Sequence, residues 1–169
     1  MILHQFFDTE SSTFTYLIAS FRGADALIID PVQQNIAEYV AILKQESLRL
    51  IYTLDSHTHD DHISGTSMLR KETSCMTLAH ELTNTGKVSR RLKDGDLISL
   101  TGIDLNVIYT PGHTADSICL YFREAGLLFT GDTVWIRGNG RPDGPTGNAA
   151  RLYDSIHRRV FILPEETTI

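Results

Sequence analysis

Eight consecutive residues, DSHTHDDH at positions 55–62, constrain this chain more than any other stretch, because they hold three histidines and three aspartates. Such groups packed closely without partners must stay solvated or bind a cation. The stretch follows LRLIYTL (48–54), which the pattern predicts to be a buried strand. In open α/β sheets, ligands bind beyond the carboxyl ends of strands, so this placement predicts a functional site.

The residue types in this octapeptide indicate a metal. Residues two apart in an extended segment point to the same side, so His57, His59 and Asp61 can converge, with His62 following where the chain bends. Imidazole and carboxylate groups suit zinc, iron or manganese, and the octapeptide offers no thiolate. The alternative is a polar surface loop that happens to be rich in histidine. The position at a strand end favours the metal.

Two later motifs can supply further ligands. TPGHT (110–114) and TGDT (130–133) each follow an apolar strand, and they bring His113 and Asp132. Taken singly, Pro-Gly-His and Gly-Asp are common turn sequences. Their shared position after strands, downstream of the octapeptide, favours a role in the same site. The remaining histidines have no such setting, and we interpret them as surface or structural residues: His4, His80 and His157.

Composition limits the class of protein. The chain has 169 residues, of which 41% are hydrophobic, enough for one globular domain over residues 1–169. The formal charge of −6 argues against nucleic-acid binding, which needs a basic face. No run of about 18 apolar residues indicates a membrane span, and the N-terminus has no secretory pattern. Cys75 and Cys119 form no CxxC pair, so we expect a reducing, cytoplasmic setting.

The apolar pattern predicts a mixed α/β fold. A Gly-containing turn joins two strands into a hairpin, and a helix follows Pro31, since Ile36, Tyr39, Val40 and Leu43 fall on one face. The last helix is predicted from its apolar stripe of Leu152, Ile156 and Val160. The other predicted elements are the hairpin strands 13–20 and 26–30, a short helix over 64–72, and strands at 97–100, 103–110, 117–122 and 126–130.

The motifs HTHDDH, TPGHT and FTGDT resemble, in this order, the HxHxDH…H…D set of the metallo-β-lactamase superfamily. Four further stretches are similar to its persulfide dioxygenase branch: SSTFTYLIA, ALIIDPV, FTGDTVWIRGNGRPD and LYDSIHRRVFILP. The similarity runs over roughly residues 4–164. It implies an αββα sandwich, in which helices flank two sheets and the metal lies at one rim.

The resemblance also implies roles for single residues. In the persulfide dioxygenase branch one Fe(II) per chain would be held by His57, His113 and Asp132. This is the two-histidine, one-carboxylate set of non-heme iron oxygenases. Arg141 would bind a carboxylate of glutathione. Three remaining residues would orient these ligands, or would hold a second metal in the zinc hydrolases of the superfamily: His59, Asp61 and His62.

The implied reaction is the oxidation of glutathione persulfide by O₂ and water to sulfite and glutathione. The main alternative is a thioester hydrolase of the glyoxalase II type, which uses zinc and needs two metals. A non-catalytic metal-binding module is a further alternative. Metal content and activity would separate the three.

The sequence departs from the branch in several places. Asp60 adds a charge beside the metal loop, Asn139 and Pro142 replace a common cysteine and threonine, and GPTG (144–147) replaces a more polar run. Arg137 could contact substrate, although a solvated arginine is the simpler interpretation. The chain stops where family members continue into a strand and a final histidine. We therefore expect the C-terminal part of the usual fold to be missing, and an unpaired sheet edge of this kind favours homo-oligomerisation.

Overall fold

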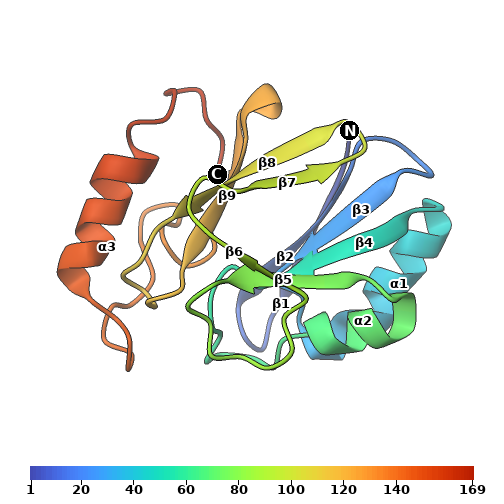
Figure 1. The fold of residues 1–169 in the computed structure, drawn as a ribbon, viewed down its shortest axis with the longest axis horizontal. Coiled ribbons are helices and arrows are strands. Elements are labelled where there is room, and N and C mark those ends of the chain that lie inside the picture. Colours follow the sequence, from blue (N-terminus) through green and yellow to red (C-terminus); the bar gives the residue numbers. More distant parts are fainter.

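The computed structural model describes residues 1–169, which form two β-sheets flanked by helices (Figure 1). The first sheet has six strands in the order β1-β2-β3-β4-β5-β6, and the second has four in the order β10-β9-β8-β7. The strands of the first sheet are β1 (Ile2–Asp8), β2 (Thr13–Ala19), β3 (Asp25–Ile29), β4 (Arg49–Leu54), β5 (Met76–His80) and β6 (Arg90–Leu92). Those of the second are β7 (Leu97–Leu100), β8 (Ile103–Tyr109), β9 (Ile118–Phe122) and β10 (Leu127–Phe129).

Helices cover the outer face of each sheet. Helices α1 (Ile36–Gln45) and α2 (Thr66–Thr73) lie against the first sheet, and α3 (Ala149–Ser155) lies against the second (Figure 1). A π-helical turn, η3 (Ile156–Val160), extends α3, and two short 3₁₀ turns are η1 (Gln33–Asn35) and η2 (Arg123–Ala125). The predicted αββα sandwich is therefore correct.

No helix has both the length and the apolar character that a bilayer span requires.

The alternation of side chains along the strands explains the layers. Leu17 and Ile28 face α1 and α2, whereas their chain neighbours Ile18 and Leu27 face the second sheet. This period of two lets every central strand supply two apolar layers. A third layer lies between the second sheet and the last helix, where the predicted stripe packs as expected: Leu152, Ile156 and Val160.

Most predicted elements form, with differences at their ends. Helix α2 begins at Thr66, two residues later than predicted. Three strands of the structure were not predicted from the sequence: β1, β5 and β6. Each of them is short or lies at the edge of the sheet, so its pairing depends on the neighbouring strand more than on its own pattern.

Strand direction brings four loops to one rim. Strands β3, β4 and β5 are parallel, so the segments after Ile29 and Leu54 emerge at the same edge. Strands β8 and β10 both pair antiparallel with β9 and therefore run in the same direction. The loops after Tyr109 and Phe129 consequently leave the second sheet at one end.

Candidate metal centre

His57, His113 and Asp132 come together at this rim. One ligand atom from each residue lies within 4.8 Å of those of the other two. The imidazole rings of His57 and His113 have centroids 4.8 Å apart, and His113 Nε2 lies 3.5 Å from Asp132 Oδ2. The three residues follow β4, β8 and β10, so both sheets contribute to the cluster.

The orientation of His113 is fixed by a backbone carbonyl. Its Nδ1 lies 2.8 Å from the carbonyl oxygen of Arg141. Because a carbonyl oxygen can only accept, Nδ1 carries a proton, and in the neutral ring Nε2 is left with its lone pair. That lone pair is on the side of Asp132, which is the arrangement that a metal ligand needs.

A relay from Asp30 orients His57 in the same way. Ser56 Oγ donates to Asp30 Oδ2 at 2.7 Å and lies 2.9 Å from His57 Nδ1. Since the hydroxyl proton is used on Asp30, Ser56 Oγ accepts from His57 Nδ1, and Nε2 of His57 keeps its lone pair. Burial, followed by the charge of His59, lowers the pKa of His57 to about 3. The ring is therefore neutral, as metal binding requires.

The sequence did not reveal Asp30 as part of the site, although it directly follows β3 at the same rim. Its buried carboxylate also accepts from the backbone N–H of Ser56 at 2.6 Å and from His59 Nε2 at 3.1 Å. Burial works to raise the pKa of Asp30, but these bonds and the nearby imidazoles lower it. Asp30 has φ +52°, a left-handed conformation that few residues other than glycine adopt. The signal that could have revealed it is a carboxylate at the end of the strand beside β4.

The remaining octapeptide ligands form a second group. One ligand atom from each of His59, Asp61 and His62 lies within 4.8 Å of the others. Asp61 Oδ1 lies 3.1 Å from His62 Nδ1, and Thr13 Oγ1 donates to Asp61 Oδ2 at 2.8 Å. The buried His62 Nε2 has no hydrogen-bond partner. We expected His57 and Asp61 to converge, and they do not. The segment bends after His57, so Asp61 lies beside His62 instead.

His59 differs electrostatically from His57. Burial alone would lower its pKa, but the hydrogen bond to Asp30, the charge of that residue and the contact with Asp61 raise the pKa well above the usual value. His59 Nδ1 lies 3.7 Å from Asp61 Oδ1. A protonated His59 thus bridges two carboxylates. Burial raises the pKa of Asp132, an effect that the imidazoles of His113 and His59 oppose.

Glycines allow the loops to approach one another. A Cβ at Gly140 would collide with the carbonyl oxygen of Asp132 and would lie 2.8 Å from His113 Nδ1. A Cβ at Gly131, which has φ +47°, would collide with Ser56 Oγ. The Gly-Asp motif and the Gly-rich loop therefore have a steric role beside the predicted ligands.

Asp116 joins the two histidine loops and was also missed by the sequence analysis. It accepts from Thr58 Oγ1 at 2.6 Å and from Thr114 Oγ1 at 2.6 Å. Thr58 follows His57, and Thr114 follows His113. Partial burial would raise the pKa of Asp116, but the hydrogen bonds from the Thr114 and Thr58 hydroxyls lower it. The carboxylate that joins the two loops is therefore ionised. Nothing in the motif pattern distinguishes this aspartate from a surface residue.

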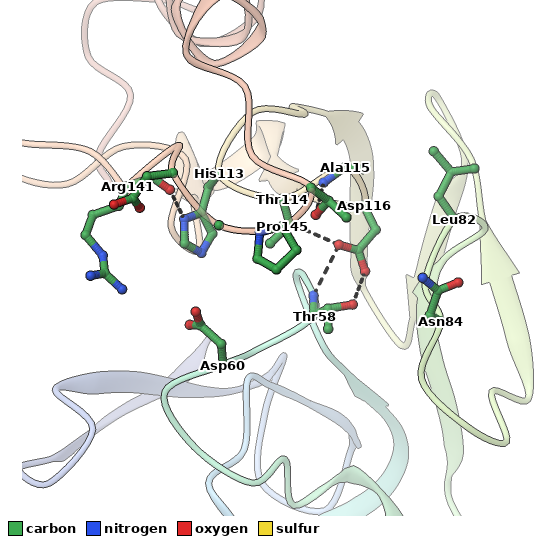
Figure 2. A pocket seen from close by; sticks show the side chains of 13 residues that line it. Thr58, Asp60, Leu82, Asn84, His113, Thr114, Ala115, Asp116, Arg141 and Pro145 are labelled. Carbon is green, nitrogen blue, oxygen red and sulfur yellow. Dashed lines mark hydrogen bonds between the residues drawn. The ribbon is translucent and has the colours of Figure 1, made fainter.

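A cavity of about 230 Å³ opens beside His113. Arg141 lines it from the Gly-rich loop, and Thr58 and Asp60 line it from the octapeptide (Figure 2). The predicted substrate residue Arg141 therefore lies next to the metal cluster. Arg137 does not line this cavity and is exposed, with φ +68°.

Among the other histidines, His80 is buried and stacks on Tyr109, with the ring centroids 4.4 Å apart, which fits a structural role.

Comparison with known proteins defines the class. A family model described as the metallo-beta-lactamase superfamily matches residues 8–167, so the chain belongs to that superfamily. The chain is 34% identical over 170 residues to persulfide dioxygenase ETHE1, mitochondrial, from Homo sapiens, covering 100% of this chain and 66% of that protein. The crystal structure of ETHE1 from Myxococcus xanthus has a TM-score of 0.94 and 38% identity, covering 99% of this chain and 73% of that one. The resemblance to the persulfide dioxygenase branch is confirmed.

The alternative branch is also represented among the relatives. A hydroxyacylglutathione hydrolase from Francisella tularensis subsp. novicida is 31% identical over 153 residues, covering 89% of this chain and 59% of that protein. The chain spans 65–66% of the length of the mammalian persulfide dioxygenases that it matches.

Proposed function

We propose that the protein containing this chain is an Fe(II)-dependent persulfide dioxygenase that oxidises glutathione persulfide with O₂. The observation that carries the proposal is the His57, His113 and Asp132 cluster, whose ligand atoms lie within 4.8 Å of one another. Two imidazoles and one carboxylate leave coordination positions open for substrate and O₂. The persulfide dioxygenases among the relatives support this choice over other activities of the fold.

The chain's own residues fit one metal in this cluster. The Arg141 carbonyl and Ser56 Oγ hold the two imidazoles with their Nε2 lone pairs free. The Asp132 carboxylate makes no hydrogen bond and lies 3.5 Å from His113 Nε2, so it is available as a ligand. Bound iron would supply redox chemistry with O₂, which zinc cannot perform.

The other groups have supporting roles in this proposal. His59 spans Asp30 and Asp61, and Asp30 is the group that orients His57 through Ser56. These contacts give His59 an orienting role beside the His57, His113 and Asp132 cluster. Arg141 would pair with a substrate carboxylate at the cavity beside His113.

The reaction balances with O₂ and water as co-reactants. The outer sulfur of the persulfide is oxidised and leaves as sulfite, the S–S bond breaks, and the inner sulfur remains as the thiol of glutathione. O₂ is reduced, and water supplies the third oxygen. Holding the persulfide in the cavity beside the metal would let proximity lower the barrier.

Oxygen uptake with glutathione persulfide tests the proposal. Iron-loaded protein should consume O₂ and release sulfite, and His57→Ala should abolish both. The matched control is His157→Ala, because His157 is exposed and contacts Tyr153 on the last helix. No uptake by the iron-loaded protein, or uptake that survives in His57→Ala, would contradict the proposal.

A second candidate is a zinc thioester hydrolase. It is favoured by the group formed by His59, Asp61 and His62 and by the hydroxyacylglutathione hydrolases among the relatives. Metal analysis separates the two, since the dioxygenase should contain one iron per chain and the hydrolase up to two zincs. Hydrolysis of a glutathione thioester by the zinc form would support the hydrolase. Bound metal with neither activity would indicate a non-catalytic module.

A further inference from the structure

The cavity beside His113 carries an unusual set of charges. One cation, Arg141, and three carboxylates line it: Asp60, Asp116 and Asp143. Asp116 is committed to Thr58 and Thr114 and is not available to a ligand. In Figure 2 no hydrogen bond reaches the Asp60 carboxylate or the guanidinium of Arg141, whose backbone carbonyl alone contacts His113.

Asp60 and Arg141 approach the cavity from opposite sides. Asp60 belongs to the octapeptide between His59 and Asp61, and Arg141 belongs to the Gly-rich loop. Figure 2 shows the Asp60 carboxylate directed toward His113 and the Arg141 side chain across the opening. A ligand whose sulfur lies at the metal cluster would therefore have an anionic and a cationic side chain within reach of its remaining atoms.

A ligand that is only anionic does not match these charges. Arg141 would attract one of its carboxylates, but Asp60 would repel it. A ligand with both a carboxylate and an ammonium group can satisfy both side chains. Glutathione carries both groups on its γ-glutamyl end, whereas simple mercapto-acids carry only the carboxylate.

We propose that Asp60 is a specificity-determining residue that binds the ammonium group of an amino-acid persulfide while Arg141 binds a carboxylate. The inference rests on the proposed function for the identity of the sulfur group. It adds that the site selects zwitterionic thiol persulfides and discriminates against persulfides that lack an amino group. Because both side chains are solvent-exposed, each ion pair contributes a factor of about two to five in affinity.

A calorimetric titration of the metal-loaded protein tests this assignment without turnover. The probes are S-methylglutathione, whose blocked thiol cannot bind the metal as a thiolate, and its analogue lacking the amino group. The native chain should bind S-methylglutathione about two- to five-fold more tightly, and the preference should shrink as salt is added. Asp60→Asn should remove the preference without changing the metal content.

Two further variants serve as comparisons. Asp104→Asn removes the same charge at an exposed position of β8 and should leave the preference intact. Equal or undetectable binding of both probes to the native chain would overturn the inference. Loss of the preference in Asp143→Asn, with Asp60→Asn unaffected, would also overturn it.

The binding test of Asp60 and the oxygen-uptake test of the proposed function can fail independently of each other. Oxygen uptake together with equal binding of the two probes would contradict only the role of Asp60. Discrimination between the probes without oxygen uptake would contradict the dioxygenase and leave a site that recognises an amino-acid thiol.

Discussion

Asp30 and Ser56 are joined by two hydrogen bonds, from the Ser56 backbone N–H to Oδ1 at 2.6 Å and from Ser56 Oγ to Oδ2 at 2.7 Å. Asp30 directly follows β3, and Ser56 lies two residues beyond the end of the neighbouring parallel strand β4, 26 positions along the chain. The pairing sets the position of Ser56, and Ser56 Oγ in turn accepts from His57 Nδ1 at 2.9 Å. A buried carboxylate thereby controls the orientation of a proposed metal ligand that it does not touch.

Ser56→Ala should weaken metal binding, because it leaves the buried His57 Nδ1–H without its acceptor. Loss of such an outer partner lowers metal affinity by about 10- to 100-fold. The unpaired group should also lower the free energy of unfolding by about 1–3 kcal/mol. Competition with a chelator measures the affinity, and Ser67→Ala at an exposed position of α2 is the control. Unchanged affinity would show that the relay has no influence on the site.

Gly140→Ala should disturb the metal cluster, because the added Cβ would meet the Asp132 carbonyl oxygen and lie 2.8 Å from His113 Nδ1. Overpacking of this kind costs about 1–3 kcal/mol. We expect a lower melting temperature and a lower metal content. Gly144→Ala is the matched control in the same loop, since its Cβ would have no neighbour within 4 Å. Equal behaviour of the two variants would contradict the steric role of Gly140.

Arg159→Gln should destabilise the protein at neutral pH and not in acid. Arg159 donates to Asp94 at 2.6 and 2.8 Å and so joins η3 to the turn before β7. Partial burial would raise the pKa of Asp94, but Arg159 and the Tyr109 backbone N–H outweigh it and lower the pKa. A lowered folded-state pKa gives stability that is present above the unfolded value of about 4 and is lost as the pH falls through the folded pKa.

Both side chains of this pair are more than 40% exposed, so the difference from the native chain should be only about 0.5–1 kcal/mol near pH 7. Urea unfolding between pH 3 and pH 7 measures it. Arg158→Gln is the control, because Arg158 pairs with Asp154 on the helix surface alone. A difference that stays constant down to pH 3 would exclude Asp94 as the titrating partner.

Neither cysteine should react in the folded protein. Burial raises the pKa of the Cys119 thiol to about 11, and burial also raises that of Cys75. Thiolate is the reactive form, so a thiol reagent should label the native chain slowly and label both residues once urea unfolds it. Rapid labelling of Cys119 in the native state would show that the second sheet opens readily. The expected result would also argue against transfer of persulfide to the chain's own thiols.

The sequence by itself determined the layers of the fold and the types of ligand available. Alternating apolar residues in β2 and β3, and the stripe of Leu152, Ile156 and Val160, dictate the faces that must be buried, because local periodicity suffices for that. The octapeptide and the two later motifs likewise carry their residue types in the chain itself. Strands β5 and β6 were not predicted because they are only five and three residues long, so their pairing with a neighbouring strand decides their conformation more than their own pattern does.

The family resemblance implied that His57, His113 and Asp132 share a site, but only the tertiary structure brings these groups together. Strand direction placed His57 with His113 and Asp132 and left Asp61 with His62, a division that spacing along the chain does not reveal. The roles of Asp30 and Asp116 depend on hydrogen bonds that span 26 and 58 positions. Such bonds form because the loops that follow separate strands lie at one rim of the fold. No local sequence pattern predicts that these loops come into contact.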